Sequence, residues 1–110
     1  MQLCDNVCMT IGLWWDDEDA DHIRRRSRRY PGATDIEPAW TLEAAVDPDR
    51  ITRDPDPKSW AGDIRVIGYS PAAGFVITVM VRSDNHSGAT AWRTSGADLR
   101  AYLAGKEGSA

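Results

Sequence analysis

The sequence predicts an α+β fold with two N-terminal helices, a mainly antiparallel sheet of three or four strands, and a C-terminal helix. The strands follow from three apolar runs at residues 62–70, 75–82 and 88–94, most of which end at a turn signal. The runs follow one another with tight connections, which is typical of neighbouring strands. The last helix follows from residues 95–105, where a capping serine precedes leucine and tyrosine at helical spacing.

The charge pattern of residues 16–29 predicts the first helix. Residues 16–21 read DDEDAD, and residues 24–29 read RRRSRR. Carboxylates favour the positive N-terminal end of a helix dipole, and arginines then occupy the other end. Apolar residues are few here, so this helix is expected to be largely solvated or docked to a charged surface. Tyr30-Pro31-Gly32 ends it, and residues 11–15 before it predict a short entry strand.

Prolines mark both ends of the second helix. Residues 35–38 read DIEP, in which Pro38 suits the first helical turn, and residues 47–49 read DPD. Residues 50–53 then predict a short edge strand, and the proline-broken segment 54–58 predicts a loop. One face of the helix is expected to be apolar and is formed by Ala39, Leu42, Ala45 and Val46.

Alternation along the strands assigns side chains to the two faces of the sheet, because a shift of one residue would exchange the faces. In the longest strand the apolar side is formed by Phe75, Ile77, Val79 and Val81. This side is expected to be the core face, joined from the neighbouring strands by Ile64, Val66, Thr90 and Trp92. The opposite face is expected to be a shallow floor, bordered by Tyr69, that brings together Arg65, Arg82 and Arg93.

The chain of 110 residues is long enough for one core, so we expect a single domain over residues 9–105. Residues 1–8 and 106–110 are predicted to be flexible tails. Gly105 is the predicted end of the last helix, since glycine commonly follows a helix C-terminus. Three apolar residues of this helix are expected to pack on the sheet: Leu99, Tyr102 and Leu103.

Composition excludes several classes of protein. No run approaches the roughly 20 apolar residues of a membrane span, and the start of the chain lacks the pattern of a secretory signal, so we expect a cytoplasmic protein. The only cysteines, Cys4 and Cys8, and the only histidines, His22 and His86, match no familiar zinc module, so we expect free thiols and no metal. The net charge of −4 argues against a protein that coats nucleic acid.

Several segments together resemble the BrnT-type toxins of bacterial type II toxin-antitoxin systems, which belong to the RelE-like ribonuclease toxins. The motif Leu13-Trp14-Trp15-Asp16 resembles an opening aromatic-Trp-Asp strand, and His22-Ile23 before basic residues resembles the first helix. Residues 40–48 resemble the second helix and its Asp-Pro turn. Residues 62–82 resemble the central hairpin, and residues 90–102 resemble the last strand and helix.

This resemblance implies a metal-independent endoribonuclease without a cofactor, restrained by an antitoxin of the ribbon-helix-helix type. Cleavage through the neighbouring 2′-hydroxyl needs a proton acceptor, a proton donor, and positive charge beside the phosphate. Arginine supplies that charge well, because its fork of donors matches phosphate oxygens. The candidate catalytic residues are Arg65, Arg82 and Arg93. The candidate RNA contacts are Arg53, Lys58, Tyr69 and His86. The candidate partner contacts are Arg24, Arg25, Arg28 and Arg29.

Two other classes of function remain open. A non-catalytic interaction module of the same fold would dock a partner through the charged first helix. The acidic charge balance favours this alternative, as does Arg25-Arg26-Ser27 where the family usually has Lys-His-Gly or Arg-His-Gly. A small-ligand-binding α+β domain is the other alternative, although the chain shows no phosphate loop or cofactor motif. Each arginine taken singly also fits an ordinary solvated surface position.

Overall fold

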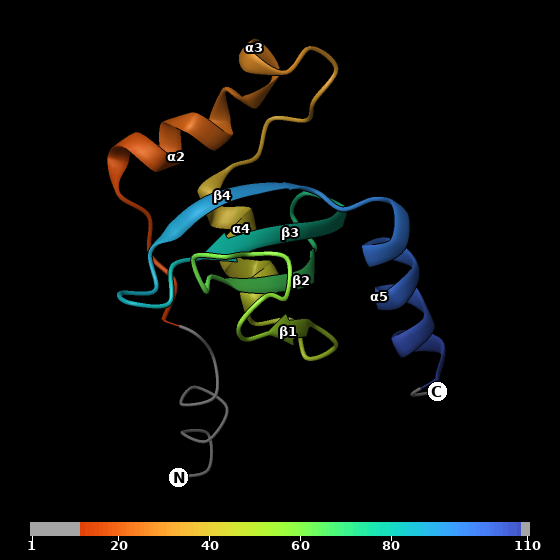
Figure 1. Cartoon of the computed structure of the whole chain (residues 1–110). Coiled ribbons are helices and arrows are strands. Elements are labelled where there is room, and N and C mark those ends of the chain that lie inside the picture. The colour runs from red at the N-terminus through yellow and green to blue at the C-terminus, as the bar shows by residue number, and fades with distance from the viewer. Residues whose placement is uncertain (1–11, 109–110) are drawn as a thin grey trace, which may run out of the picture.

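Four antiparallel strands form one sheet in the order β1-β2-β3-β4 (Figure 1). The computed structural model describes residues 12–108. The strands are β1 (Ile51–Arg53), β2 (Ile64–Ser70), β3 (Phe75–Val81) and β4 (Gly88–Arg93). The helices are α2 (Asp17–Arg24), α3 (Arg26–Arg29), α4 (Pro38–Ala45) and α5 (Gly96–Gly108). The predicted α+β class, the antiparallel sheet with its short edge strand, and the C-terminal helix are therefore confirmed.

The predicted first helix is divided in two at Arg25, and hydrogen bonds explain the break. The carbonyl of Ile23 accepts a bond from the backbone N–H of Ile36 at 2.9 Å. The N–H of Ser27, which would reach that carbonyl in a continuous helix, donates instead to the Asp35 carboxylate at 2.7 Å. Asp35 and Ile36 therefore take the two partners of the helical hydrogen bond that Ser27 and Ile23 would otherwise form with each other. The acidic start agrees with the prediction, since the Asp16 carboxylate caps α2.

Helix α4 packs closely on β2 through two small residues. Gly68 leaves room for the backbone of Ala44, because a Cβ at Gly68 would lie only 2.1 Å from the Ala44 carbonyl oxygen. The predicted apolar face of α4 was largely wrong: of its four residues Ala45 is buried, whereas Ala39 is exposed and Leu42 and Val46 are 44% and 58% exposed. Thr41 is fully buried in their place and donates its hydroxyl to the Pro38 carbonyl.

The core lies between the sheet and the helices α2 and α4. It is formed by Ile23, Ile36, Ala44, Ile64, Val66, Ile77, Val79, Val81 and Ala91. The predicted face of β4 was wrong, because Ala91 pairs with Val79 and Trp92 pairs with Thr78. Paired residues of antiparallel strands share a face, so Ala91 enters the core and Trp92 lies on the other side. The small Ala91 side chain suits the close approach of α2, which packs against β4 (Figure 1).

Helix α5 covers part of the second face. Its residues Tyr102 and Leu99 pack with Ile67 and Val76 of the sheet, as predicted. Leu103 is 47% exposed, so that part of the prediction was wrong. The helix runs past Gly105 to Gly108, so its predicted end was also wrong. The predictions for residues 1–8, including both cysteines, lie outside the described residues.

The chain before α2 joins the sheet at a single point rather than as the predicted strand. Trp14 forms an isolated parallel bridge to Ser87, and its indole N–H donates to the Asn85 carbonyl at 2.9 Å. This contact positions the start of α2 beside the β3–β4 hairpin. None of the helices within residues 12–108 has both the length and the apolar character needed to span a membrane.

Substituting Gly68 with alanine should destabilise the fold strongly. The added Cβ would collide with backbone atoms of α4, which cannot move aside as a flexible side chain can. We expect the free energy of unfolding to fall by about 3 kcal/mol or more in urea denaturation. Gly105→Ala is the matched control, because nothing lies within 4 Å of its added Cβ. Equal stability of the two variants would contradict the described packing of α4.

Candidate nucleic-acid interface

Arg65 is held in a nearly buried ion-pair network on the second face of the sheet. Its guanidinium contacts the Asp56 and Asp98 carboxylates, each at 2.9 Å. The side chains of Arg65 and Asp56 are only 11% and 2% exposed. Arg53 joins the network by donating to Asp98 at 2.9 Å. The network therefore ties together β1, the β1–β2 loop, β2 and α5. It occupies both terminal nitrogens of Arg65, which would otherwise bind a phosphate, whereas the Nε–H is buried without a partner among the described residues.

Arg82 lies elsewhere and is also paired. Its guanidinium donates to the Asp19 carboxylate of α2 at 3.0 Å, to the Ser87 hydroxyl at 3.0 Å, and to the Gly88 carbonyl at 3.1 Å. A register irregularity between Met80 and Val81 precedes Arg82. Through these hydrogen bonds Arg82 connects α2 to the β3–β4 hairpin.

Arg93 lies on the core side of the sheet, because it pairs with Ile77. It is exposed at the end of β4, and its guanidinium lies 4.6 Å from the ring centre of Phe75. The three arginines are thus placed at three different sites. The prediction that Arg65, Arg82 and Arg93 share one open face was wrong, since it depended on the incorrect register of β4.

The other predicted RNA contacts are scattered as well. Lys58 is exposed in the loop between β1 and β2. Tyr69 is 38% exposed on β2, and its backbone N–H donates to the Asp47 carboxylate at 2.8 Å. His86 is in the β3–β4 hairpin with a φ of 64°, and its N–H donates to the Arg82 carbonyl. Arg53 and Lys58 adjoin the Arg65 network, since Arg53 donates to Asp98 and the charge of Lys58 helps to lower the pKa of that carboxyl. Tyr69 and His86 lie elsewhere, beside Asp47 and Arg82.

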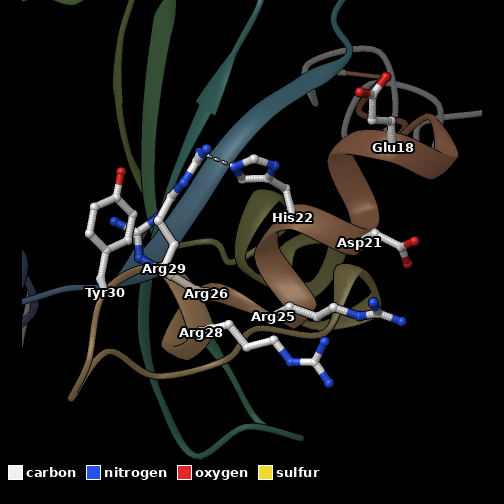
Figure 2. A pocket seen from close by; sticks show the side chains of 8 residues that line it. All are labelled: Glu18, Asp21, His22, Arg25, Arg26, Arg28, Arg29 and Tyr30. Atoms are coloured by element: carbon white, nitrogen blue, oxygen red, sulfur yellow. Dashed lines mark hydrogen bonds between the residues drawn. The ribbon is translucent and has the colours of Figure 1, made fainter.

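A different cluster of cations gathers on α2 and α3 (Figure 2). It surrounds a hollow of about 470 Å³. We call it the α2–α3 surface, and it is formed by Glu18, Asp21, His22, Arg25, Arg26, Arg28, Arg29 and Tyr30. Figure 2 shows the side chains of Arg25 and Arg28 extending in the same direction, whereas Arg29 turns to His22.

The arginines of residues 24–29 differ in their partners, including Arg24, which lies beside the α2–α3 surface and is not part of it. Arg24 lies 3.6 Å from the Asp21 carboxylate and 3.3 Å from that of Glu37. Arg25, Arg28 and Arg29 are exposed and make no ion pair with any described residue. Arg28 still acts on a nearby carboxylate at longer range, because its charge helps to lower the pKa of Asp35. A group of exposed guanidinium groups without close ion pairs is an arrangement that attracts an anionic ligand.

The contact between Arg29 and His22 orients the imidazole. The Nη1 atom of Arg29 lies 2.7 Å from Nε2 of His22. A guanidinium has only donors, so a hydrogen bond between these two atoms requires Nε2 to be the acceptor. The contact therefore turns Nε2 of His22 to the guanidinium of Arg29 (Figure 2).

Sequence reasoning did not find the contact that joins this surface to the sheet. Arg26 donates to the Thr90 hydroxyl of β4 at 3.3 Å. Its guanidinium carbon lies 4.9 Å from the ring centre of Tyr30 and 5.7 Å from that of Trp92. Arg65 approaches the same indole to 5.5 Å. The register of β4 was the missing information, because it turns Trp92 away from the core.

Two titratable groups, Tyr102 of α5 and Asp47, are also linked, although they do not belong to the α2–α3 surface. Burial raises the pKa of the Tyr102 hydroxyl, and its hydrogen bond to the Asp47 carboxylate raises it further. Among residues 12–108, no three histidine, cysteine, aspartate or glutamate side chains gather as a metal site would require. The α2–α3 surface is therefore the strongest candidate for ligand binding in the described part of the chain.

Acidification should weaken the Arg65 network. The hydrogen bond from Arg65 lowers the pKa of Asp56 from its usual 3.8. Because the folded pKa lies below the unfolded one, the stabilisation is complete above about pH 4 and is lost as pH falls through the folded value. Asp56→Asn should cost about 3 kcal/mol at pH 7 and flatten the loss of stability in acid, measured by urea denaturation across pH.

The exposed turn residue Asp84 provides the control for this experiment. Asp84→Asn should keep the stability and the pH dependence of the unmodified protein. If Asp56→Asn behaved like Asp84→Asn at every pH, the network would not contribute as described.

Comparison of the chain with models of known protein families, with curated proteins and with solved structures finds no match. The geometry of the residues is accordingly what defines the candidate site. That geometry assigns it to α2, α3 and the adjoining strand β4, rather than to the predicted floor of the sheet.

Proposed function

We propose that the protein binds RNA through the α2–α3 surface and the neighbouring end of β4, and that it acts as a ribonuclease of the toxin type. One observation carries the proposal: the exposed guanidinium groups of Arg25, Arg28 and Arg29 make no ion pair within 4 Å among the described residues, and they line the same hollow as the exposed ring of Tyr30. Arginine and aromatic side chains together are typical of sites for single-stranded nucleic acid.

The overall negative charge is compatible with this site because the acidic residues are used locally. Asp56 and Asp98 pair with Arg65, and Asp19 pairs with Arg82. Interactions between exposed charges are screened beyond about 10 Å at moderate salt. The electrostatic potential at a bound phosphate therefore depends mainly on the nearby arginines. Binding should therefore be local and strongly dependent on salt.

His22 supports a catalytic role for the same surface. Its Nε2 atom accepts a hydrogen bond from Arg29. A phosphate that drew Arg29 away would free this nitrogen to take the proton of a neighbouring 2′-hydroxyl. The 2′-oxygen would then bond to phosphorus as the bond from phosphorus to the 5′-oxygen breaks, and water would protonate the leaving 5′-oxygen. The guanidinium would stabilise the charge gained by the phosphate. Arg93 remains the sheet arginine suited to contact RNA, since Arg65 and Arg82 donate to carboxylates.

An antitoxin of the expected kind would act by covering this surface. Carboxylates of a protein partner would pair with the same exposed arginines that bind phosphate, so partner and RNA would compete. A purely protein-binding module is the second candidate function. The observation that favours it is that Glu18 and Asp21 line the same hollow as the arginines, and this mixed pattern suits a partner with both kinds of charge.

Replacing Arg28 and Arg29 with alanine should weaken RNA binding at least tenfold. In fluorescence anisotropy with a labelled single-stranded oligoribonucleotide, loss of two phosphate contacts should also reduce the slope of log affinity against log salt by about 1.4. Arg100→Ala on α5 is the control for charge, since Arg100 is exposed and belongs to another element. Equal affinity of all variants would contradict the proposed interface, and an acidic protein ligand bound in place of RNA would favour the second function.

Cleavage can be tested with the two histidines of the chain. His22→Ala should retain RNA binding and lose cleavage of the oligoribonucleotide, followed by gel electrophoresis. His86→Ala should retain both, because His86 belongs to the hairpin and not to the α2–α3 surface. Unmodified protein that binds RNA and leaves it intact would identify a binding protein without catalysis.

A further inference from the structure

Arg26 stands between two aromatic rings and two hollows of the surface. The rings belong to Tyr30 and Trp92. One hollow of about 320 Å³ is lined in part by His22, Tyr30 and Arg26. The other, of about 260 Å³, is lined in part by Arg26, Trp92 and Arg93. Arg26 therefore lines both hollows, and its guanidinium lies where the planar base of a ligand could contact Tyr30 or Trp92.

The ring of Tyr30 is accessible to a ligand. Tyr30 is 50% exposed, although its side chain is large and apolar, and it follows directly after the last residue of α3. Tyr30 ends α3 with its N–H bonded to the Arg26 carbonyl at 2.9 Å, so the position of the ring is set by the helix end. An exposed aromatic ring on a fixed backbone, surrounded by arginines, is a typical platform for an unpaired base.

Arg26 is held weakly enough to be displaced. Among the described residues it makes no ion pair with a carboxylate, and its contacts are the two rings and one long hydrogen bond of 3.3 Å to Thr90. A phosphate offers the guanidinium a charge-assisted, bidentate partner, which is stronger than these contacts. Binding of an anionic strand would therefore draw Arg26 away from the rings.

We propose that Tyr30 is a stacking platform for an unpaired nucleobase, with Arg26 as the side chain that vacates the ring and turns to the adjacent phosphate. This inference rests on the proposed RNA binding and adds the class of substrate, which is single-stranded RNA. Stacking reads no base edge, so the platform accepts all four bases. Trp92, held on its strand beside Arg26 and Arg65, offers the second ring for the neighbouring base.

The experiment compares two probes on three variants. The probes are a single-stranded oligoribonucleotide and inorganic polyphosphate of similar length, which has the charges without the bases. Tyr30→Ala should weaken binding of the oligoribonucleotide about tenfold and leave polyphosphate binding unchanged, because only the stacking contact is lost. Tyr30→Phe should bind like the unmodified protein, since the ring remains. Tyr69→Ala, which removes an exposed ring on β2, should also bind normally.

The possible failures are distinguishable. If the unmodified protein bound neither probe, the proposed RNA binding itself would be overturned. If it bound both probes and Tyr30→Ala weakened both equally, or neither, the surface would be electrostatic only and the stacking platform would be excluded. Equal affinity for a blunt RNA duplex would exclude it as well, because paired bases cannot stack on Tyr30. Circular dichroism of each variant checks that the fold is retained.

Discussion

The pairing of β3 with β4 is the constraint on which the candidate site depends. Val79 faces Ala91, so a small residue enters the core where α2 lies against the sheet. The same register turns Trp92 to the opposite side, beside the guanidinium groups of Arg65 and Arg26. Shifting this pairing by one residue would bury Trp92 under α2 and remove its contact with Arg26.

The distribution of carboxylates then decides which arginines can bind a ligand. Asp56, Asp98 and Asp19 pair with arginines that stabilise the fold, and the side chains of these pairs are partly or largely buried. The hollow on α2 and α3 is lined by more arginines than carboxylates, with Glu18 and Asp21 as its acidic residues. Of the neighbouring carboxylates, Asp35 accepts hydrogen bonds from Ser27, and Glu37 accepts one from Arg24. The arginines that stabilise the fold are thus distinguished from those that can bind a ligand by whether a carboxylate pairs with them closely, and not by their position in the sequence.

The sequence was sufficient to predict most helices and strands, but it was not sufficient to predict which residues form the candidate site. Strand periodicity and turn residues placed β2, β3 and α5, and the prolines placed α4, because these signals are local. The register of β4 was not predictable in this way, since hydrophobicity favours Trp92 over Ala91 in a core. Cation–π contacts with Arg65 and Arg26 compensate for leaving the indole on the other face. The partners of the arginines were equally hidden, because Asp98 lies 33 residues from Arg65 and Asp19 lies 63 from Arg82.

The most direct test of this account observes the arginine side chains themselves. A titration of the protein with single-stranded RNA, followed by NMR of the guanidinium Nε–H signals, distinguishes the two groups of arginines. We predict that the signals of Arg25, Arg26, Arg28 and Arg29 shift, whereas those of Arg65 and Arg82 stay in place. Shifts at Arg65 and Arg82 with an unchanged α2–α3 surface would contradict the account.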